Sequence, residues 1–200
     1  MKQKTYESEL PAGYQKAYYL NAKDKKVGIL FNLIALVIMI AVLAVGVLPL
    51  INTERTREEI SETALMLFPL GLLLVMLIYI VSHELVHGIA YKALTGQKLT
   101  FGLSWSCAFC GVPAIYTYRK TALVALLAPF VVFDLVFGAL AVWFFFLHPI
   151  FYLGALVLLG LHVGGCCGDL YVTLLFLFRF RDPNTLMRDT GPEQTFYIPQ

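Results

Sequence analysis

The amino-acid sequence predicts an all-α polytopic membrane protein with about four transmembrane helices and a short membrane-associated β-hairpin between the second and the third. Of the 200 residues, 59% are hydrophobic and 14% are charged, whereas globular chains carry about 25% charged residues. A chain of this size cannot bury so much apolar surface in one core. The apolar residues also form long stretches almost free of charge, so lipid is the expected solvent for most of the chain.

Charge and cysteine content exclude several other classes of protein. The net charge is +2, and the basic residues lie scattered outside the apolar stretches, so no nucleic-acid partner is expected. Four cysteines are too few for a disulfide framework. Cys107 and Cys110 have the spacing of a zinc knuckle, but the adjacent pair Cys166 and Cys167 does not, so reduced cysteines are favoured over a four-thiolate site.

The first two spans are predicted at residues 27–51 and 63–91. The first carries no charge and exceeds the roughly 20 residues that a helix needs to cross hydrocarbon. The leader before it is long and rich in Lys and Tyr, unlike a signal peptide, so this span is expected to stay as an anchor. In the second, His83, Glu84 and His87 lie near the C-terminal end of the apolar stretch.

The third and fourth spans are predicted at residues 122–147 and 150–178. No Lys or Arg occurs between Thr121 and Phe178. The dipeptide at residues 148–149, His-Pro, supplies the turn between the two spans, because proline disfavours continuation of the preceding helix.

Basic residues in the connecting segments predict the orientation. Only Arg55 and Arg57, of 15 Lys and Arg, fall between the first two spans. The positive-inside rule then places both termini in the cytoplasm. We therefore expect an integral, multi-pass protein with a cytoplasmic N-terminal segment at residues 1–26, one membrane-embedded domain at 27–180 and a cytoplasmic tail at 181–200.

The segment between the second and third spans differs from the rest of the chain. Residues 100–105, from Thr100 to Trp105, alternate with a period of two, and residues 113–118 are rich in β-forming types. The sequence Cys-Ala-Phe-Cys-Gly lies between them at residues 107–111. This pattern predicts a β-hairpin whose two strands are residues 100–105 and 113–118.

The sequence His83-Glu84-Leu85-Val86-His87 is an H-E-x-x-H motif within the second predicted helix. A spacing of four residues places both imidazoles on one helical face, where they can bind one Zn²⁺, while Glu84 can act as a general base. The alternative is a pair of buried histidines with no metal. Because ionisable side chains within a span are costly and mark functional sites, the metal is favoured.

Asp169 is the best candidate for a third ligand, since a catalytic zinc normally has three protein ligands and one open position. His83 and Asp169 lie 20 and 19 residues after the outer ends of two spans that run in the same direction. At 1.5 Å per residue they reach the same depth to within a helical turn. The glycines at 160, 164 and 168 would let another helix approach the fourth span closely.

Three other side chains in the spans could support or replace Asp169. His162 and Cys166 share its helical face, so either could be the third ligand or could orient the ligand carboxylate. Asp134 lies in the middle of the third span, where a lone carboxylate is costly. It is therefore expected to pair with a polar group or to stay protonated, and it is less favoured as a ligand.

The chain resembles the site-2 protease superfamily of intramembrane zinc metalloproteases, and most closely its short bacterial members, the zincin peptidases. The resemblance covers about residues 63–180. It rests on His-Glu-Leu-Val-His-Gly at 83–88, the β-prone segment after it, Ala-Pro-Phe at 128–130 and Gly-Gly-Cys-Cys-Gly-Asp at 164–169. The better-known members carry Asp-Gly and Gly-Pro where this chain has Gly168-Asp169 and Ala128-Pro129.

The resemblance implies that His83, His87 and Asp169 bind Zn²⁺ and that Glu84 is the catalytic base of a zinc metalloendopeptidase in a bacterial cell membrane. Its expected partners are the lipid bilayer and a membrane protein or peptide substrate. An extended substrate could add to the edge of the strand at 100–105, which reads the main chain with little sequence dependence. A catalytically inactive zinc-binding scaffold and, less favoured, a metal transporter are the alternatives.

Overall fold

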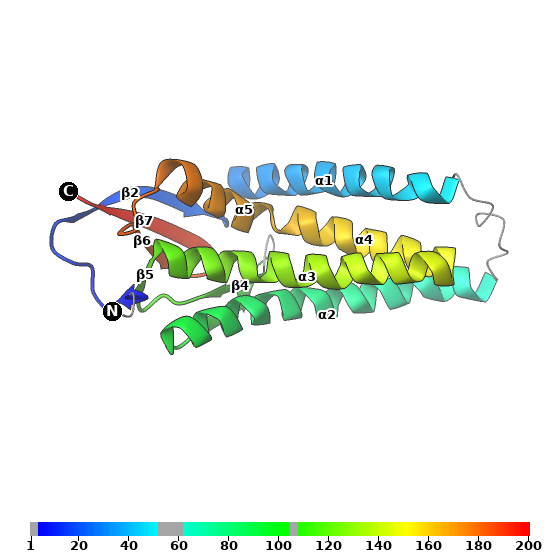
Figure 1. Ribbon diagram of the computed structural model, residues 1–200, viewed down its shortest axis with the longest axis horizontal. Helices are drawn as coiled ribbons and strands as arrows, with labels where there is room; N and C mark the ends of the chain where they lie inside the picture. The colour runs from blue at the N-terminus through cyan, green and yellow to red at the C-terminus, as the bar shows by residue number, and fades with distance from the viewer. Residues whose placement is uncertain (1–3, 52–61, 105–107) are drawn as a thin grey trace. The chain divides into compact units, whose positions relative to one another are not determined.

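The computed structural model describes residues 4–51, 62–104 and 108–200 (Figure 1). Four apolar helical segments dominate it. They are α1 (Lys25–Ile51), α2 (Glu62–Thr95), α3 (Arg119–Leu147) and a fourth built from α4 (Pro149–Gly165), α5 (Cys167–Leu174) and the π-helix η2 (Leu175–Arg179). Each of the four is long and apolar enough to cross a membrane, as an integral membrane protein requires. Their bounds agree with the four predicted spans to within a few residues.

His148 separates α3 from α4, as the sequence predicts. Its backbone is extended (φ −161°, ψ 137°), which is the conformation that a following proline favours. The N–H of Ile150 donates to its imidazole Nδ1 at 3.2 Å and so caps the first turn of α4. Pro149 occupies the first turn, where a missing N–H costs no helical hydrogen bond.

The prediction of an all-α chain is wrong, because the structure also holds a five-stranded antiparallel sheet. Its strands follow the order β1, β5, β6, β7, β2, and Figure 1 shows β2, β6 and β7 side by side. Their bounds are Tyr6–Glu7 (β1), Tyr14–Asn21 (β2), Tyr116–Tyr118 (β5), Leu186–Asp189 (β6) and Glu193–Pro199 (β7).

Sequence periodicity does not reveal this sheet for two reasons. The strands come from the two ends of the chain and from its middle, so every pairing except that of β6 with β7 is non-local, with Tyr14 opposite Pro199 and Thr117 opposite Met187. In β2 the register shifts between Lys16 and Tyr18, and such an irregularity breaks the period of two that marks a strand.

A hairpin does follow α2, but its second strand differs from the prediction. β3 (Thr100–Leu103) pairs with β4 (Ala108–Gly111), which is the segment that was expected to connect the strands. The segment expected as the second strand instead contributes β5 to the larger sheet. β4 ends where the N–H of Val112 donates to the carbonyl of Asp189 at 2.9 Å, immediately before Pro113. Trp105 and Cys107 lie outside the described residues.

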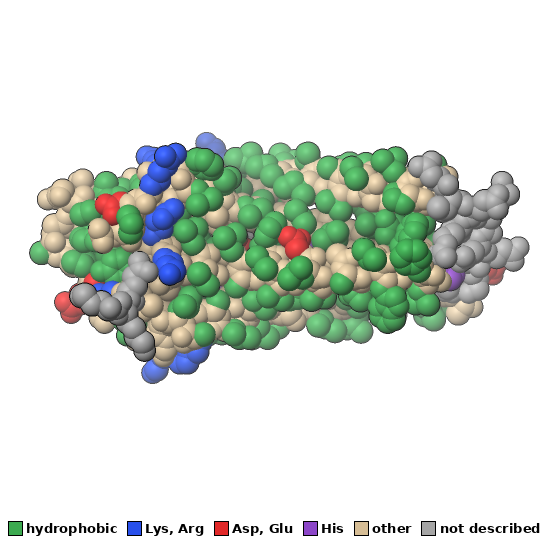
Figure 2. Space-filling model, in the orientation of Figure 1, with side chains coloured by type: hydrophobic (Ala, Val, Ile, Leu, Met, Phe, Trp, Pro, Cys, Tyr) green, Lys and Arg blue, Asp and Glu red, His purple; other side chains and the backbone are tan. Residues whose placement is uncertain are grey.

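The chain divides into two compact units. The first, which we call the sheet unit, comprises residues 1–31, 82–129 and 168–200; the second, the helical unit, comprises 32–81 and 130–167. Every described Lys and Arg belongs to the sheet unit, and Figure 2 shows basic side chains gathered in one band. The helical unit packs around two apolar clusters, one centred on Tyr152 and Leu156 and the other on Tyr79, Phe137 and Leu158.

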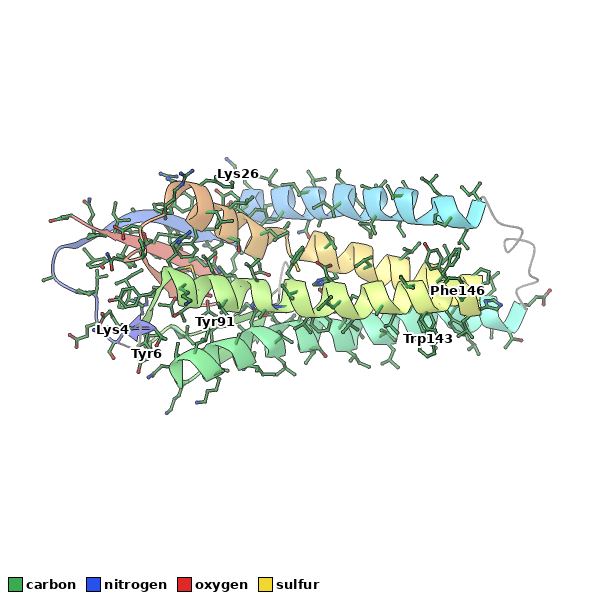
Figure 3. The ribbon with its side chains drawn as sticks, viewed as in Figure 1. Lys4, Tyr6, Lys26, Tyr91, Trp143 and Phe146 are labelled. Carbon is green, nitrogen blue, oxygen red and sulfur yellow. The ribbon has the colours of Figure 1, made fainter. Side chains whose placement is uncertain are left out.

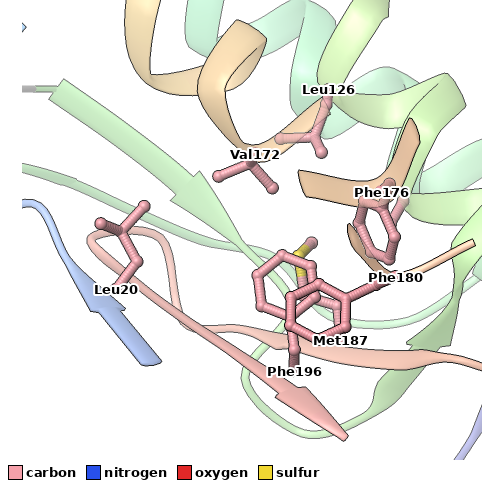
Figure 4. Close-up of a cluster of buried hydrophobic side chains, with 8 residues drawn as sticks. Leu20, Leu126, Val172, Phe176, Phe180, Met187 and Phe196 are labelled. Carbon is pink, nitrogen blue, oxygen red and sulfur yellow. The ribbon is translucent and has the colours of Figure 1, made fainter. Parts of the chain in front are cut away.

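The core of the sheet unit joins one face of the sheet to helical segments (Figure 4). Phe196 of β7 is fully buried, and its ring lies 4.8 Å from the rings of both Phe176 and Phe180. Met187 of β6 and Leu126 of α3 complete the contact. This cluster therefore fastens the C-terminal strands to the helices of the unit.

Replacing Phe196 with alanine should lower the free energy of unfolding by about 3–5 kcal/mol, because truncating a fully buried aromatic side chain leaves a cavity. Phe178→Ala is the matched control, since the Phe178 side chain is 66% exposed. The measurement is thermal unfolding of both variants in detergent. Equal shifts of the unfolding midpoint in the two variants would contradict the packing described here.

Candidate metal centre

The structure brings His83, His87 and Asp169 together within the sheet unit. The imidazole Nε2 atoms of His83 and His87 lie 3.5 and 3.3 Å from Oδ2 of Asp169. Both histidines are buried on one face of α2, and their ring centroids are 5.0 Å apart. Asp169 approaches them from the first turn of α5. Two imidazoles and one carboxylate thus converge from two different helices.

A helix break places Asp169 at the start of its own helix. α4 ends at Gly165, and the N–H of Cys166 donates to the carbonyl of His162 at 3.0 Å. The chain then starts α5 at Cys167. The break directly follows Gly164 and Gly165, and glycine weakens a helix interior.

The spacing of the three ligand atoms fits a zinc ion. Tetrahedral coordination with bonds of about 2.0–2.2 Å keeps neighbouring ligand atoms about 3.4 Å apart. The two nitrogen-to-oxygen distances, 3.5 and 3.3 Å, lie on either side of this value. The donor set, two neutral imidazoles and one carboxylate, is one that catalytic zinc uses. The residues present therefore fit the ion that the H-E-x-x-H motif implies.

His87 is held in the tautomer that metal binding needs. Its Nδ1 lies 2.8 Å from the carbonyl oxygen of Ala125 in α3. A carbonyl can only accept, so Nδ1 carries a proton and donates it, which leaves Nε2, the atom facing Asp169, for a metal ion when the ring is neutral. Metal-binding histidines commonly have such a backbone partner, which fixes both the tautomer and the ring orientation.

Glu84 lies next to His83 on α2 and is partly buried. Its carboxylate interacts electrostatically with His83, His87 and Asp169. The charge of Glu84 therefore lies within electrostatic range of the three converging side chains.

Cys110 of β4 is buried near this carboxylate. Burial, with Glu84 and Asp189 nearby, raises the pKa of its thiol to about 12. In the absence of a metal ion its thiol therefore stays neutral at physiological pH.

The hairpin lies against α2 next to the histidines. A Cβ atom added to Gly88 would lie 2.7 Å from the Phe101 ring and 3.1 Å from the Leu99 side chain. The ends of the Phe101 and Leu99 side chains therefore pack closely over this glycine. Within the described residues β3 pairs with β4 alone, so its other edge carries unpaired backbone groups.

A buried tyrosine–aspartate pair links α2 to the C-terminal strands. Tyr91 (labelled in Figure 3), one helical turn after His87, donates its hydroxyl proton to Oδ2 of Asp189 at 2.7 Å. Both side chains are almost fully buried. Oδ1 of Asp189 accepts from the N–H of Gly191 at 2.9 Å. Burial raises the pKa of Asp189 to about 6, although these two donors favour its ionised form.

The remaining predicted site residues, His162, Cys166 and Asp134, belong to the helical unit, where they contact one another. The Nδ1 atom of His162 lies 3.6 Å from the sulfur of Cys166, and its Nε2 lies 3.5 Å from Oδ1 of Asp134. Asp134 was expected to pair with a polar group or to stay protonated, and His162 is the polar side chain that lies beside it. A role for these three side chains in orienting Asp169 remains a prediction.

The sequence analysis did not identify Ala125, Tyr91 or Asp189. Ala125 contributes only its backbone carbonyl, which every residue type has, so the sequence does not mark this position. Tyr91 follows His87 by four residues and so shares its face of α2, and this spacing could have pointed to it. Asp189 lies in a polar tail, about one hundred residues from Tyr91, and no local pattern marks it.

Asp189→Asn should remove a pH dependence of stability. The pKa of Asp189 is about 6 in the folded protein and 3.8 in an unconstrained chain. As the pH falls from 7 to 4, the folded state therefore takes up this proton before the unfolded state does, which stabilises the fold. The free energy of unfolding of the wild type, relative to that of the variant, should rise by on the order of 2 kcal/mol over this range. The measurement is unfolding in detergent at several pH values, and a constant difference would contradict the assignment.

Comparison with known proteins agrees with the geometry. A family model described as "Putative zincin peptidase" matches residues 75–182, which include the H-E-x-x-H motif and Asp169. Neither the curated proteins nor the solved structures gave a match. The matched segment is more than half of the chain, and the chain therefore belongs to the putative zincin peptidase family.

Proposed function

We propose that the protein is a zinc-dependent intramembrane metalloprotease that hydrolyses peptide bonds of membrane-associated substrates. One observation carries the proposal: Asp169 lies within 3.5 Å of both histidines of an H-E-x-x-H motif, in a helix apolar enough to cross a membrane. Family membership supports a metallopeptidase. The proposal goes further in placing the reaction within the membrane and in assigning roles to single residues.

His83, His87 and Asp169 would hold the ion, and Glu84 would move the proton. A bound Zn²⁺ supplies Lewis-acid chemistry and lowers the pKa of water toward neutrality. Glu84 accepts a proton from the attacking water, whose oxygen bonds to the peptide carbonyl carbon. When the carbon–nitrogen bond breaks, Glu84 donates this proton to the leaving amine. Ala125 keeps His87 in the required tautomer throughout.

The free edge of β3 offers a way to present the substrate. An extended peptide can add to a strand edge through main-chain hydrogen bonds. The Phe101 side chain of β3 packs over Gly88, which directly follows His87, so we expect a peptide on that edge to run close to the histidines. Main-chain pairing also unwinds a helical substrate locally, and an extended scissile bond is the conformation that zinc peptidases bind.

The arrangement of the strands supports one orientation in a bacterial cell membrane. β2 and β7 are paired neighbours, which supports the proposal that both strands lie on the same side of the bilayer. All described Lys and Arg residues belong to the same unit as these strands. By the positive-inside rule this side is the cytoplasm.

The decisive experiment compares zinc content and cleavage in the same preparations. The wild type should carry about one zinc per chain, and Glu84→Gln should keep the zinc because Glu84 is not a ligand in this motif. Cleavage of a fluorescence-quenched transmembrane peptide in proteoliposomes should fall by about 10²–10⁴ in Glu84→Gln, since the base is lost. Glu62→Gln, at the exposed start of α2, is the matched control and should retain both properties.

Asp169→Asn should behave differently, because a neutral amide is a poor zinc ligand. Zinc and cleavage should fall together in this variant and in the double variant His83→Ala with His87→Ala. Full cleavage by Glu84→Gln would exclude the peptidase mechanism and favour a zinc-binding scaffold. Full zinc occupancy in Asp169→Asn would move the third ligand elsewhere.

The orientation is tested by labelling single cysteines in a variant that lacks the four native ones. Cysteines introduced at Gln97 and Thr190 should react with a membrane-impermeant maleimide only after the cytoplasmic side is opened. A cysteine at Thr56 should react in intact cells, because the positive-inside rule places this segment outside. Labelling of Gln97 or Thr190 in intact cells would reverse the orientation.

A further inference from the structure

Asp134 is a carboxylate in the middle of an apolar span. It lies about halfway along α3, and its side chain is 31% exposed. Apart from Glu62 at the start of α2, it is the only carboxylate among the described residues of the helical unit. Ionisable groups at such positions are rare in membrane helices and are associated with function. The proposed hydrolysis makes no use of it.

Asp134 has one weak contact on its buried side. Its Oδ1 lies 3.5 Å from Nε2 of His162, but the same nitrogen also lies 3.2 Å from the carbonyl oxygen of Phe130. On the opposite side of the ring, Nδ1 pairs with the Tyr79 hydroxyl at 2.8 Å. His162 is fully buried and its hydrogen-bonding capacity is used within the unit. Among the described residues, Oδ2 of Asp134 has no partner.

A glycine and exposed apolar side chains lie near Asp134 on the surface of α3. Gly138 lies one turn further along α3, and a Cβ atom added there would meet nothing within 4 Å. Around this glycine lie the exposed side chains of Val131, Leu135 and Val142. Figure 2 shows an acidic group surrounded by hydrophobic side chains on the face drawn. Small residues at membrane-helix surfaces let a neighbouring backbone come close.

We propose that the α3 face formed by Val131, Asp134, Leu135, Gly138 and Val142 docks a transmembrane helix of a different protein that carries a Lys or Arg at mid-membrane depth. The basic group would pair with the free oxygen of Asp134, while the glycine admits the partner's backbone. This proposal is independent of the peptidase function.

Charge complementarity identifies the partner as a different chain. A carboxylate facing hydrocarbon is stabilised by a cation that arrives already surrounded by apolar surface. A second copy of this chain offers no such cation, because the described part of the helical unit contains no Lys or Arg. The exposed carboxylate of Asp134 and the open surface at Gly138 are two separate features, and a helix with a basic side chain would fit both.

The test uses the full-length protein in phosphatidylcholine vesicles and synthetic 21-residue transmembrane peptides. One peptide is leucine-rich with a single central lysine, and its control has leucine at that position. Energy transfer between labelled protein and labelled peptide reports association. The wild type should bind the lysine peptide more tightly than the control peptide, and Asp134→Leu should weaken that binding about three- to tenfold.

Two further variants keep the proposal falsifiable if Asp134→Leu does not fold. Gly138→Leu fills this open surface and leaves the charge in place, so it should also weaken binding of the lysine peptide. Val37→Leu, on the exposed surface of α1, should leave binding unchanged. Equal binding of both peptides by the wild type, or unchanged binding by folded Asp134→Leu and Gly138→Leu, would overturn the proposal. Asp134-dependent energy transfer between two labelled copies without peptide would also overturn it, in favour of self-association.

Discussion

The close approach of two imidazoles and one carboxylate is the constraint to which the surrounding residues conform. Each of these groups is costly to bury alone, so each must be held in one orientation by another part of the chain. α2 carries His83 and His87 on a common face, and Ala125 fixes the proton on His87. Asp169 has to come from a separate helix, and the break at Cys166 lets α5 begin where its first turn faces the histidines.

Support for this arrangement continues beyond the ligands. One turn after His87, Tyr91 joins α2 to Asp189, and Val112 joins the end of β4 to the same residue through its backbone. Asp189 belongs to β6, which pairs with β7, and β7 in turn pairs with β2. The sheet therefore links the metal-site helix to strands from both terminal parts of the chain. The family match ends at residue 182, before β6 and β7, so the strands that brace the site lie outside the matched segment.

The sequence predicts the helices well because their signal is local. Absence of charge over more than 20 residues marks a span wherever it occurs, and the pair His148-Pro149 marks a turn. The histidine spacing of the H-E-x-x-H motif is likewise local, and the depth of Asp169 follows from counting residues along a helix of known rise.

The sheet could not be predicted in the same way, because its information is non-local. β2 and β7 pair residues that are more than 170 positions apart, and no window of sequence contains both. The hairpin shows the same limit on a smaller scale. Residues 113–118 have the composition of a strand, but the N–H of Val112 donates to the carbonyl of Asp189 in β6. The second strand of the hairpin therefore ends before Val112. Composition can therefore indicate that a segment forms a strand, but it does not indicate which strand pairs with it.

The pairing of β2 with β7 also sets an order of events during synthesis. β2 is synthesised before the four helical segments, whereas its neighbour β7 is synthesised after them. Asp169 and Asp189 are likewise made late, long after His83 and His87 have entered α2. A ribosome-bound chain therefore holds the histidines without the carboxylate that converges on them and without the strands that brace their helix. The three candidate ligands therefore cannot converge until α5 has been synthesised, and β6 and β7 are made later still.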